Sequence, residues 1–160
     1  MDAMRLLPKD FKIANRVMHH PDVYPDICDD YADPNHTQLG TFFLQQDIIW
    51  LLHPSEHILI MGVPRTFTVY ECHTMIEPEG RGRQAVKDVQ RTAEWFFNHH
   101  TSCEKLVTYV PFFNKKAKIF ALAVGMKLEG VCTQSFKKDG KLVDQWVLGL
   151  EKEKFLCRQS

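Results

Sequence analysis

Hydrophobic periodicity changes abruptly at the sequence EPEG, residues 77–80. Residues 66–76 alternate with the period of two that is typical of a half-buried strand, whereas apolar side chains recur at helical spacing from residue 83 to 100. Proline and glycine in the intervening segment favour a tight turn. The chain is therefore predicted to pass from a strand through a turn into a long amphipathic helix, so its fold must pack a helix on a sheet.

The remaining sequence alternates between the same two kinds of element. Its patterns predict helices at 9–18 and 114–124, and strands at 39–44, 48–52, 57–61, 105–113, 128–136 and 142–150. Asp139-Gly140 between the last two strands predicts a tight hairpin. Residues 21–36 contain three prolines and five aspartates and are predicted to form an irregular acidic loop. Neither a repeat nor a linker interrupts this order, so we expect one α/β domain over residues 1–160.

Composition excludes several classes of protein. A hydrophobic content of 44% and a charged content of 25% are ordinary for globular proteins. No apolar run approaches the ~20 residues that cross a bilayer, and the N-terminus does not read as a signal peptide, so we expect a cytoplasmic protein without a membrane partner. The sequence contains no basic stripe with interleaved aromatic residues, which is the pattern typical of nucleic-acid binding, so we expect no nucleic-acid partner. Five cysteines without a CxxC motif indicate free thiols, and the scattered histidines predict no metal site.

Charge is distributed unevenly along the chain. Residues 1–80 contain 5 Lys and Arg against 12 Asp and Glu, a balance of −7, and the second half carries the compensating +7. A basic half can attract an anionic ligand, and it can equally dock on the acidic half of its own chain.

The predicted turn into the long helix is a candidate anion site. The first backbone N–H groups of a helix have no partner within the helix, and the helix dipole adds partial positive charge at this end. Arg81 and Arg83 could donate charge-assisted hydrogen bonds to a phosphate there, or could simply be solvated. The sequence contains neither a P-loop motif nor a complete GxGxxG motif.

A second informative segment runs from the predicted strand at 105–113 into the helix at 114–124. Asn114 is suited to cap this helix at its N-terminus, and Gly125 to terminate it.

Together the two segments resemble the GNAT superfamily of acetyl-CoA-dependent acyltransferases. The matching positions are Met75, Ile76, Pro78, Arg81, Gly82, Asn114, Ala117 and Gly125, and the resemblance covers about residues 40–150. It implies a single-domain GNAT-like α/β fold, with a mixed central sheet, splayed central strands and helices on both faces. It also implies that coenzyme A is held by Met75, Ile76, Arg81, Gly82, Arg83, Gln84, Ala85, Val86, Asn114 and Phe120.

The sequence departs from the family pattern at several positions. Gln84 and Val86 stand where the family usually has glycine or alanine, and these side chains could narrow the approach of a pyrophosphate. Ala121 stands where the family usually has the tyrosine that protonates the leaving thiolate. Met126 replaces the phenylalanine of the family's terminal Gly-Phe.

Acyl transfer to an amine requires a base, because an alkylammonium ion is not nucleophilic at neutral pH. Glu71 and His73 lie two residues apart on the strand and so share one face, which makes them the candidate catalytic residues. The backbone N–H groups at Met75 and Ile76 could stabilise charge on the thioester oxygen. The resemblance thus predicts an N-acyltransferase that transfers an acetyl group from acetyl-CoA to an amine of a small molecule or protein.

An alternative stays open at this point. Within the superfamily the chain most resembles phage-encoded GNAT-like proteins, which combine a PEGRG turn, here residues 78–82, with a strand end Pro-x-x-Asn, here residues 111–114. Some of these proteins are described as head-assembly proteins rather than enzymes. Under this interpretation the chain would lack catalysis, bind phage structural proteins and lie in the host cytoplasm. The missing tyrosine and Gln84 favour it, whereas Arg81, Gly82 and Asn114 favour the enzyme. Homodimer formation is likewise left open.

Overall fold

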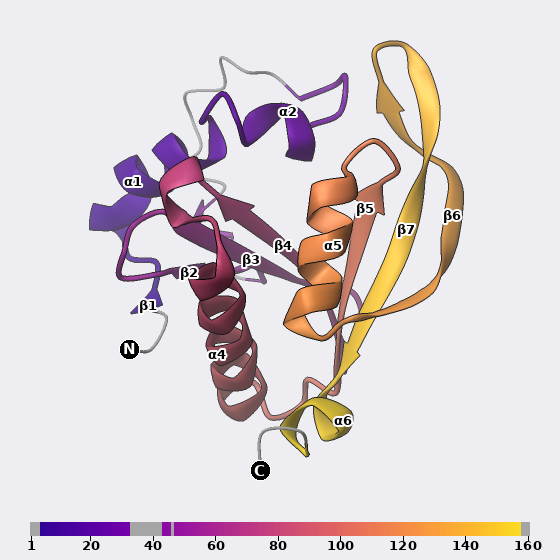
Figure 1. The fold of residues 1–160 in the computed structure, drawn as a ribbon. Helices are drawn as coiled ribbons and strands as arrows, with labels where there is room; N and C mark the ends of the chain where they lie inside the picture. The colour runs from indigo at the N-terminus through magenta and orange to yellow at the C-terminus, as the bar shows by residue number, and fades with distance from the viewer. Residues whose placement is uncertain (1–3, 33–42, 46, 158–160) are drawn as a thin grey trace.

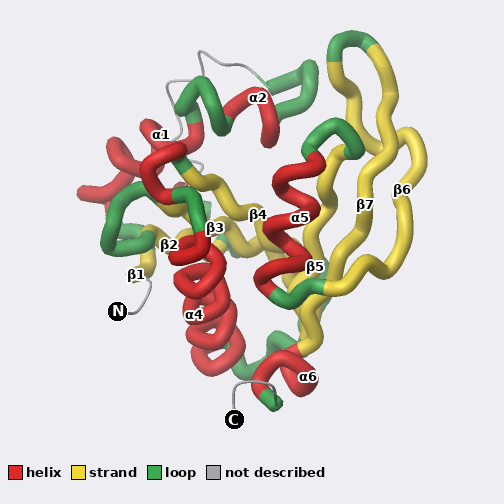
Figure 2. Tube along the Cα trace, viewed as in Figure 1, coloured by secondary structure: helices red, strands yellow, loops and turns green. Residues whose placement is uncertain are grey.

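The computed structural model describes residues 4–32, 43–45 and 47–157, and these form an α/β fold around one mixed sheet (Figure 1; Figure 2). In the described residues the strand order is β1-β2-β3-β4-β5-β7-β6. The strands are β1 (Met4–Arg5), β2 (Ile49–Leu52), β3 (Ile58–Pro64), β4 (Val69–Ile76), β5 (Lys105–Pro111), β6 (Lys127–Lys138) and β7 (Lys141–Glu151). The helices are α1 (Phe11–Met18), α2 (Tyr24–Ile27), α4 (Arg83–His99), α5 (Lys115–Val124) and α6 (Lys152–Leu156), with 3₁₀ turns η1 (Pro8–Asp10) and η2 (Pro78–Gly80).

The predicted strand, turn and long helix are confirmed as β4, η2 and α4. β4 begins only at Val69, because the hydroxyl of Thr66 accepts hydrogen bonds from the N–H groups of Thr68 and Val69 and closes a turn before it. The hairpin is confirmed too: Asp139 and Gly140 join β6 to β7 with φ angles of 51° and 74°.

Other predictions were incomplete. Residues 39–42 of the expected strand at 39–44 lie outside the described residues, and Phe43 and Leu44 do not lie in a strand. Phe43 instead packs its ring against Phe11 and Trp50. The sequence reading missed β1, α2 and α6, which have two, four and five residues, because elements this short have no readable period.

Helices cover both faces of the sheet. α4 and α5 lie side by side on one face, where Phe96, Phe97 and Ala121 join residues of β5 and β7 in one buried cluster (Figure 1). α1 packs on the other face, and its Ala14 and Val17 share a second cluster with residues of β2, β3 and β4. Because side chains alternate between the two faces along β4, the side chain of Met75 points towards α1. The residues on either side of Met75 in the strand point towards α4 and α5.

The two central strands separate partway along their length. β4 and β5 are parallel and pair only at Val69–Glu71 and Lys105–Val107. Beyond this point β5 stays paired with β7 as far as Pro111, whereas β4 stays paired with β3 as far as Ile76. The second halves of β4 and β5 consequently face each other without a backbone ladder, as the resemblance implied.

The basic half of the chain docks on its acidic half. The ammonium group of Lys138 donates to the carbonyl oxygens of Pro25 and Cys28, 2.8 and 3.1 Å away. The carboxylate of Asp30 accepts hydrogen bonds from the N–H groups of Asp139 and Gly140, each 2.8 Å long. The hydrogen bond from Gly140 is the largest cause that holds the pKa of Asp30 below its ordinary value, and the bond from Asp139 adds to it. The tip of the β6–β7 hairpin thus holds in place the segment around α2, residues 21–30.

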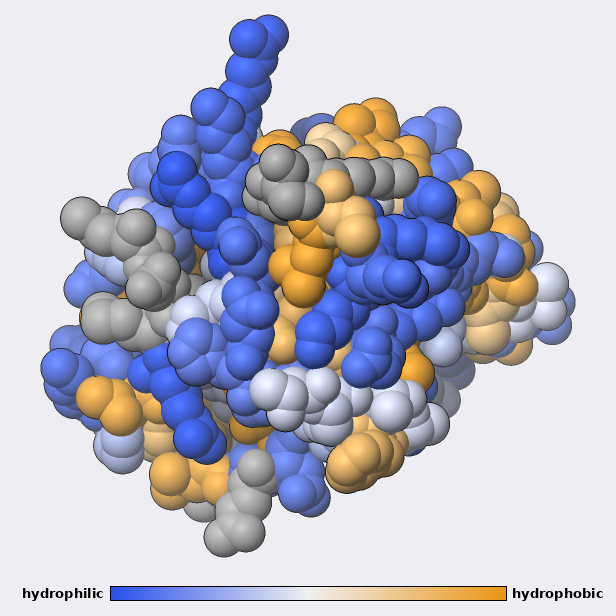
Figure 3. Space-filling view, turned by 90° about the horizontal axis from the view of Figure 1, so that it is seen from below, coloured by the Kyte–Doolittle hydropathy of each residue, from blue (hydrophilic) through white to orange (hydrophobic). Residues whose placement is uncertain are grey.

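Exposed hydrophobic side chains occur on α5 and on the outer strand β6. They are Ile119, Leu122, Leu128 and Val131, whose exposed fractions run from 43% to 66%. In Figure 3 orange surface covers much of the right-hand side, the side of β6 in Figure 1. Within the described ranges, no helix is long and apolar enough to span a membrane.

Candidate active site

A cavity of about 480 Å³ lies at the end of β4 and the start of α5, beyond the point at which β4 and β5 stop pairing. Three parts of the chain line it: the segment around α2, the end of β4 with the following turn, and the start of α5. Its lining residues are Pro21, Asp22, Val23, Pro25, Asp26, Ile27, Thr74, Met75, Ile76, Arg81, Asn114, Lys116, Ala117 and Phe120. Five of the twelve predicted site residues therefore meet around one space.

Arg81 fastens the segment around α2 to the end of β4. Its guanidinium donates to the carbonyl oxygen of Ile76 at 3.1 Å and to that of Asp22 at 2.7 Å. Two of its five N–H donors are thus engaged by the protein itself. Arg81 consequently closes one side of the cavity, in addition to any contact with a ligand.

The N-terminus of α4 is open to a ligand. Gly82 is the N-cap residue with φ 117°, a conformation that side-chain-bearing residues rarely adopt, and no side chain caps the helix. A Cβ atom placed on Gly82 would meet nothing within 4 Å. Arg83 is exposed in the first helical turn. Free N–H groups, helix dipole and a nearby cation make this end suitable for a phosphate group.

The side chains that replace family glycines point away from this end of the helix. The amide of Gln84 donates to Asp88, 2.8 Å away and one turn further along α4. Val86 packs against the buried cluster that contains Ala85. The space beside Gly82 therefore stays open despite both departures.

The end of β4 presents backbone groups to the cavity. The N–H of Glu77 donates to the carbonyl oxygen of His57, on the side of β3. Backbone N–H groups along an antiparallel strand point alternately to one side and the other, so the N–H of Met75 faces β3 as well. The N–H groups of Thr74 and Ile76 then face the open edge. Ile76 is thus the better donor of the predicted pair, while the side chain of Met75 is buried in the cluster under α1.

Glu71 and His73 contact each other, as their spacing predicted. The His73 Nε2 atom lies 3.0 Å from Glu71 Oε1, and the Arg65 Nε atom lies 2.9 Å from Glu71 Oε2. The hydrogen bond from His73 lowers the pKa of Glu71 against the opposing effect of burial, and Arg65 adds to the lowering. Neither Glu71 nor His73 lines the cavity. A carboxylate held in this way is a weak base, and it orients the imidazole of His73.

Asn114 and Phe120 belong to the start of α5. The Asn114 side chain accepts a hydrogen bond of 3.0 Å from the N–H of Ala117, which confirms it as the N-cap. Gly125 ends the helix with φ 114°, as predicted. Phe120 is half-buried and lies on the wall of the cavity.

A second, apolar cavity of about 110 Å³ lies between the sheet and helices α4 and α5. It shares three lining residues with the larger cavity, namely Thr74, Ala117 and Phe120. Burial raises the pKa of the Cys72 thiol in its wall to about 12, so this cysteine stays neutral at ordinary pH. Sequence reasoning missed this cavity, because no local pattern encodes an unfilled volume.

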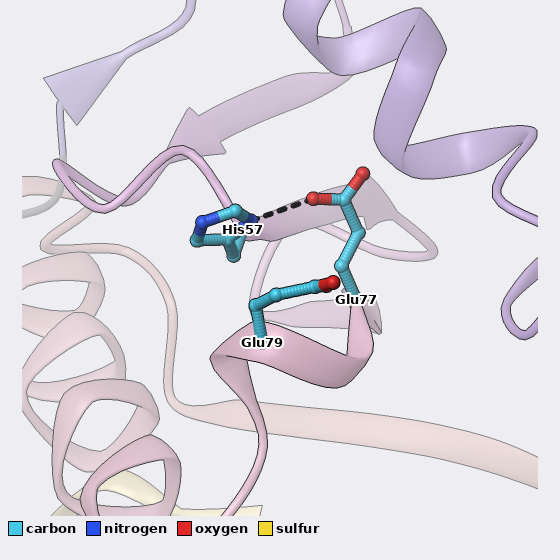
Figure 4. Close-up of side chains that lie close together, drawn as sticks. All are labelled: His57, Glu77 and Glu79. Carbon is cyan, nitrogen blue, oxygen red and sulfur yellow. Dashed lines mark hydrogen bonds and ion pairs between the residues drawn. The ribbon is translucent and has the colours of Figure 1, made fainter.

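His57, Glu77 and Glu79 gather just beyond β4 (Figure 4), with potential ligand atoms within 4.8 Å of one another. Glu77 is only 2% exposed, and it accepts a 2.7 Å hydrogen bond from His57. Both of its oxygens also accept bonds of 3.0 Å from the guanidinium of Arg16 on α1. Since Arg16 already compensates the carboxylate charge, we interpret this cluster as a structural tie between α1 and the end of β4.

Comparisons with known proteins identify the fold. No protein-family model and no curated protein sequence matches the chain. Among solved structures, a mutant form of the spermidine/spermine N-acetyltransferase SpeG from Vibrio cholerae is similar, with a TM-score of 0.79, 16% identity and coverage of 99% of this chain and 97% of that chain. The spermidine N-acetyltransferase from Vibrio cholerae in complex with CoA and spermine aligns with a TM-score of 0.76, 15% identity and 96% of both chains. A GNAT-family acetyltransferase from Bacillus anthracis aligns with a TM-score of 0.74, 14% identity and 94% of both chains.

The chain therefore has the fold of GNAT acetyltransferases, as its motifs implied. None of these three neighbours is described as a phage or head-assembly protein, so the comparison gives the assembly alternative no support.

Proposed function

We propose that this protein is a CoA-dependent N-acyltransferase whose acceptor is a small cationic amine. The observation that carries the proposal is the cavity enclosed by the end of β4, the segment around α2 and the start of α5, next to the uncapped N-terminus of α4. A similar fold that is described in complex with CoA and spermine supports it.

The residues present fit an acyl-CoA. The first turn of α4, with Gly82 and Arg83, would hold the pyrophosphate, and the cavity would receive the pantetheine arm. Bound there, the cosubstrate supplies a thioester whose carbonyl carbon forms a C–N bond with the amine as its C–S bond breaks. The N–H of Ile76 at the open edge of β4 would donate to the carbonyl oxygen.

Carboxylates of the segment around α2 would position the amine. Asp22 and Asp26 line the cavity opposite α5, where they can attract a cationic substrate. His73, oriented by Glu71, would take the proton that the amine loses. Because neither residue lines the cavity, this proton would travel through water. Ala121 offers no proton donor, so the leaving thiolate would take its proton from solvent.

The decisive experiment is calorimetric titration of the purified protein with acetyl-CoA. We expect binding that weakens in Arg83→Ala but not in Arg91→Ala, a control on the same helix two turns from the proposed site. A ligand present at 100 times its Kd adds about 2.7 kcal/mol to the free energy of unfolding, so a thermal shift gives an independent readout. If neither acetyl-CoA nor a longer-chain acyl-CoA binds at millimolar concentration, the proposal is overturned and the assembly alternative must be considered again.

Turnover with a cationic diamine or polyamine tests the proposed base. We expect Glu71→Gln and His73→Ala to lower kcat while leaving the affinity for acetyl-CoA unchanged. Full turnover in both variants would refute their assignment. The apolar residues on α5 and β6 also allow a homodimer, which light scattering would detect.

A further inference from the structure

The apolar cavity under the separated strands has a defined relation to the proposed reaction site. Cys72 and Thr74 of β4 and Thr108 and Val110 of β5 line it, and all four lie in the halves of these strands that do not pair with each other. Through Thr74, Ala117 and Phe120 it adjoins the larger cavity. It therefore extends inward from the edge of β4 at which the thioester carbonyl would lie.

The chemistry of the cavity wall suits a hydrocarbon chain. Apart from Cys72 and three threonines, its lining consists of apolar residues, among them Phe96, Leu106 and Val110. No charged residue lines it among those described. Its volume of about 110 Å³ approaches that of apolar cavities of about 150 Å³ that stay dry and admit benzene. A chain of a few carbon atoms has a matching size and polarity.

We propose that this cavity holds the acyl chain of a CoA thioester, so that the protein accepts acyl groups longer than acetyl. The inference rests on the proposed function and specifies its acyl donor. Ala121 on α5 sets the size of the cavity, because it contributes only a methyl group to the wall. A larger side chain at this position would shorten the chain that fits.

The test is calorimetric titration of the wild-type protein with CoA, acetyl-CoA, butyryl-CoA and hexanoyl-CoA. Burial of each methylene group is expected to tighten binding about fourfold, so butyryl-CoA should bind about 15-fold more tightly than acetyl-CoA. Ala121→Leu should remove this preference while acetyl-CoA still binds. Ala123→Leu makes the same substitution on an exposed face of the same helix and should leave the preference intact.

The outcomes separate the two proposals. If all thioesters bind and butyryl-CoA binds no more tightly than acetyl-CoA, the acyl pocket is refuted and the proposed function stands. If no thioester binds, the proposed function is overturned and the acyl pocket with it. If Ala121→Leu does not fold, the wild-type series alone decides the question.

Discussion

The ion pair between Arg16 and Glu77 allows a test of whether the contact between α1 and the end of β4 stabilises the fold. Removing one partner of a fully buried pair costs about 3–5 kcal/mol, because the other charge stays buried. Glu77 is 2% exposed, but the Arg16 side chain is 48% exposed, and His57 would keep its hydrogen bond to Glu77. We therefore expect Arg16→Ala to lower the free energy of unfolding by about 2 kcal/mol, which corresponds to about 4–8 °C in Tm.

The effect of this substitution should depend on pH. Burial by itself would raise the pKa of Glu77, but the hydrogen bonds from His57 and Arg16 outweigh it and lower the pKa below the ordinary 4.5. A lowered carboxyl pKa contributes stability that is present above 4.5 and is lost as the pH falls through the folded-state pKa. The difference between wild type and Arg16→Ala should consequently be complete at pH 7 and shrink below about pH 4.5.

The assay is thermal unfolding followed by circular dichroism from pH 7 to pH 3. Lys12→Ala, a loss of charge at an exposed position of the same helix, is the matched control and should change Tm little. Equal Tm values for wild type and Arg16→Ala at pH 7, or a difference that stays constant down to pH 3, would refute the reasoning.

Three further predictions concern the two cavities and their surroundings. Asn114→Ala removes the N-cap of α5 and should cost about 1 kcal/mol in urea unfolding, and an unchanged midpoint would contradict the capping role. Cys72, whose pKa is raised to about 12, should resist iodoacetamide at pH 8 while the exposed Cys157 reacts. Mass spectrometry measures the order of alkylation, and modification of Cys72 before Cys157 would contradict this prediction. Ala121→Leu fills the apolar cavity of about 110 Å³ and should raise the free energy of unfolding by up to about 2.6 kcal/mol, whereas a loss in calorimetry would show that the cavity cannot accept the added atoms.

Local sequence patterns determined most of the elements. The change of period around residues 77–80, the caps at Asn114 and Gly125 and the Asp139-Gly140 hairpin all depend on neighbouring residues, so they could be predicted without tertiary information. The contact of Glu71 with His73 follows in the same way from the period of a strand.

Tertiary structure decided the state of the candidate site. Arg81 reaches Asp22, 59 residues away in sequence, and Arg16 reaches Glu77 across 61 residues, so no local pattern could reveal that the protein already engages these charges. The apolar cavity beside Ala121 arises because β4 and β5 stop pairing beneath two helices. Such features depend on how distant side chains fill a shared volume, and only the packed fold determines that.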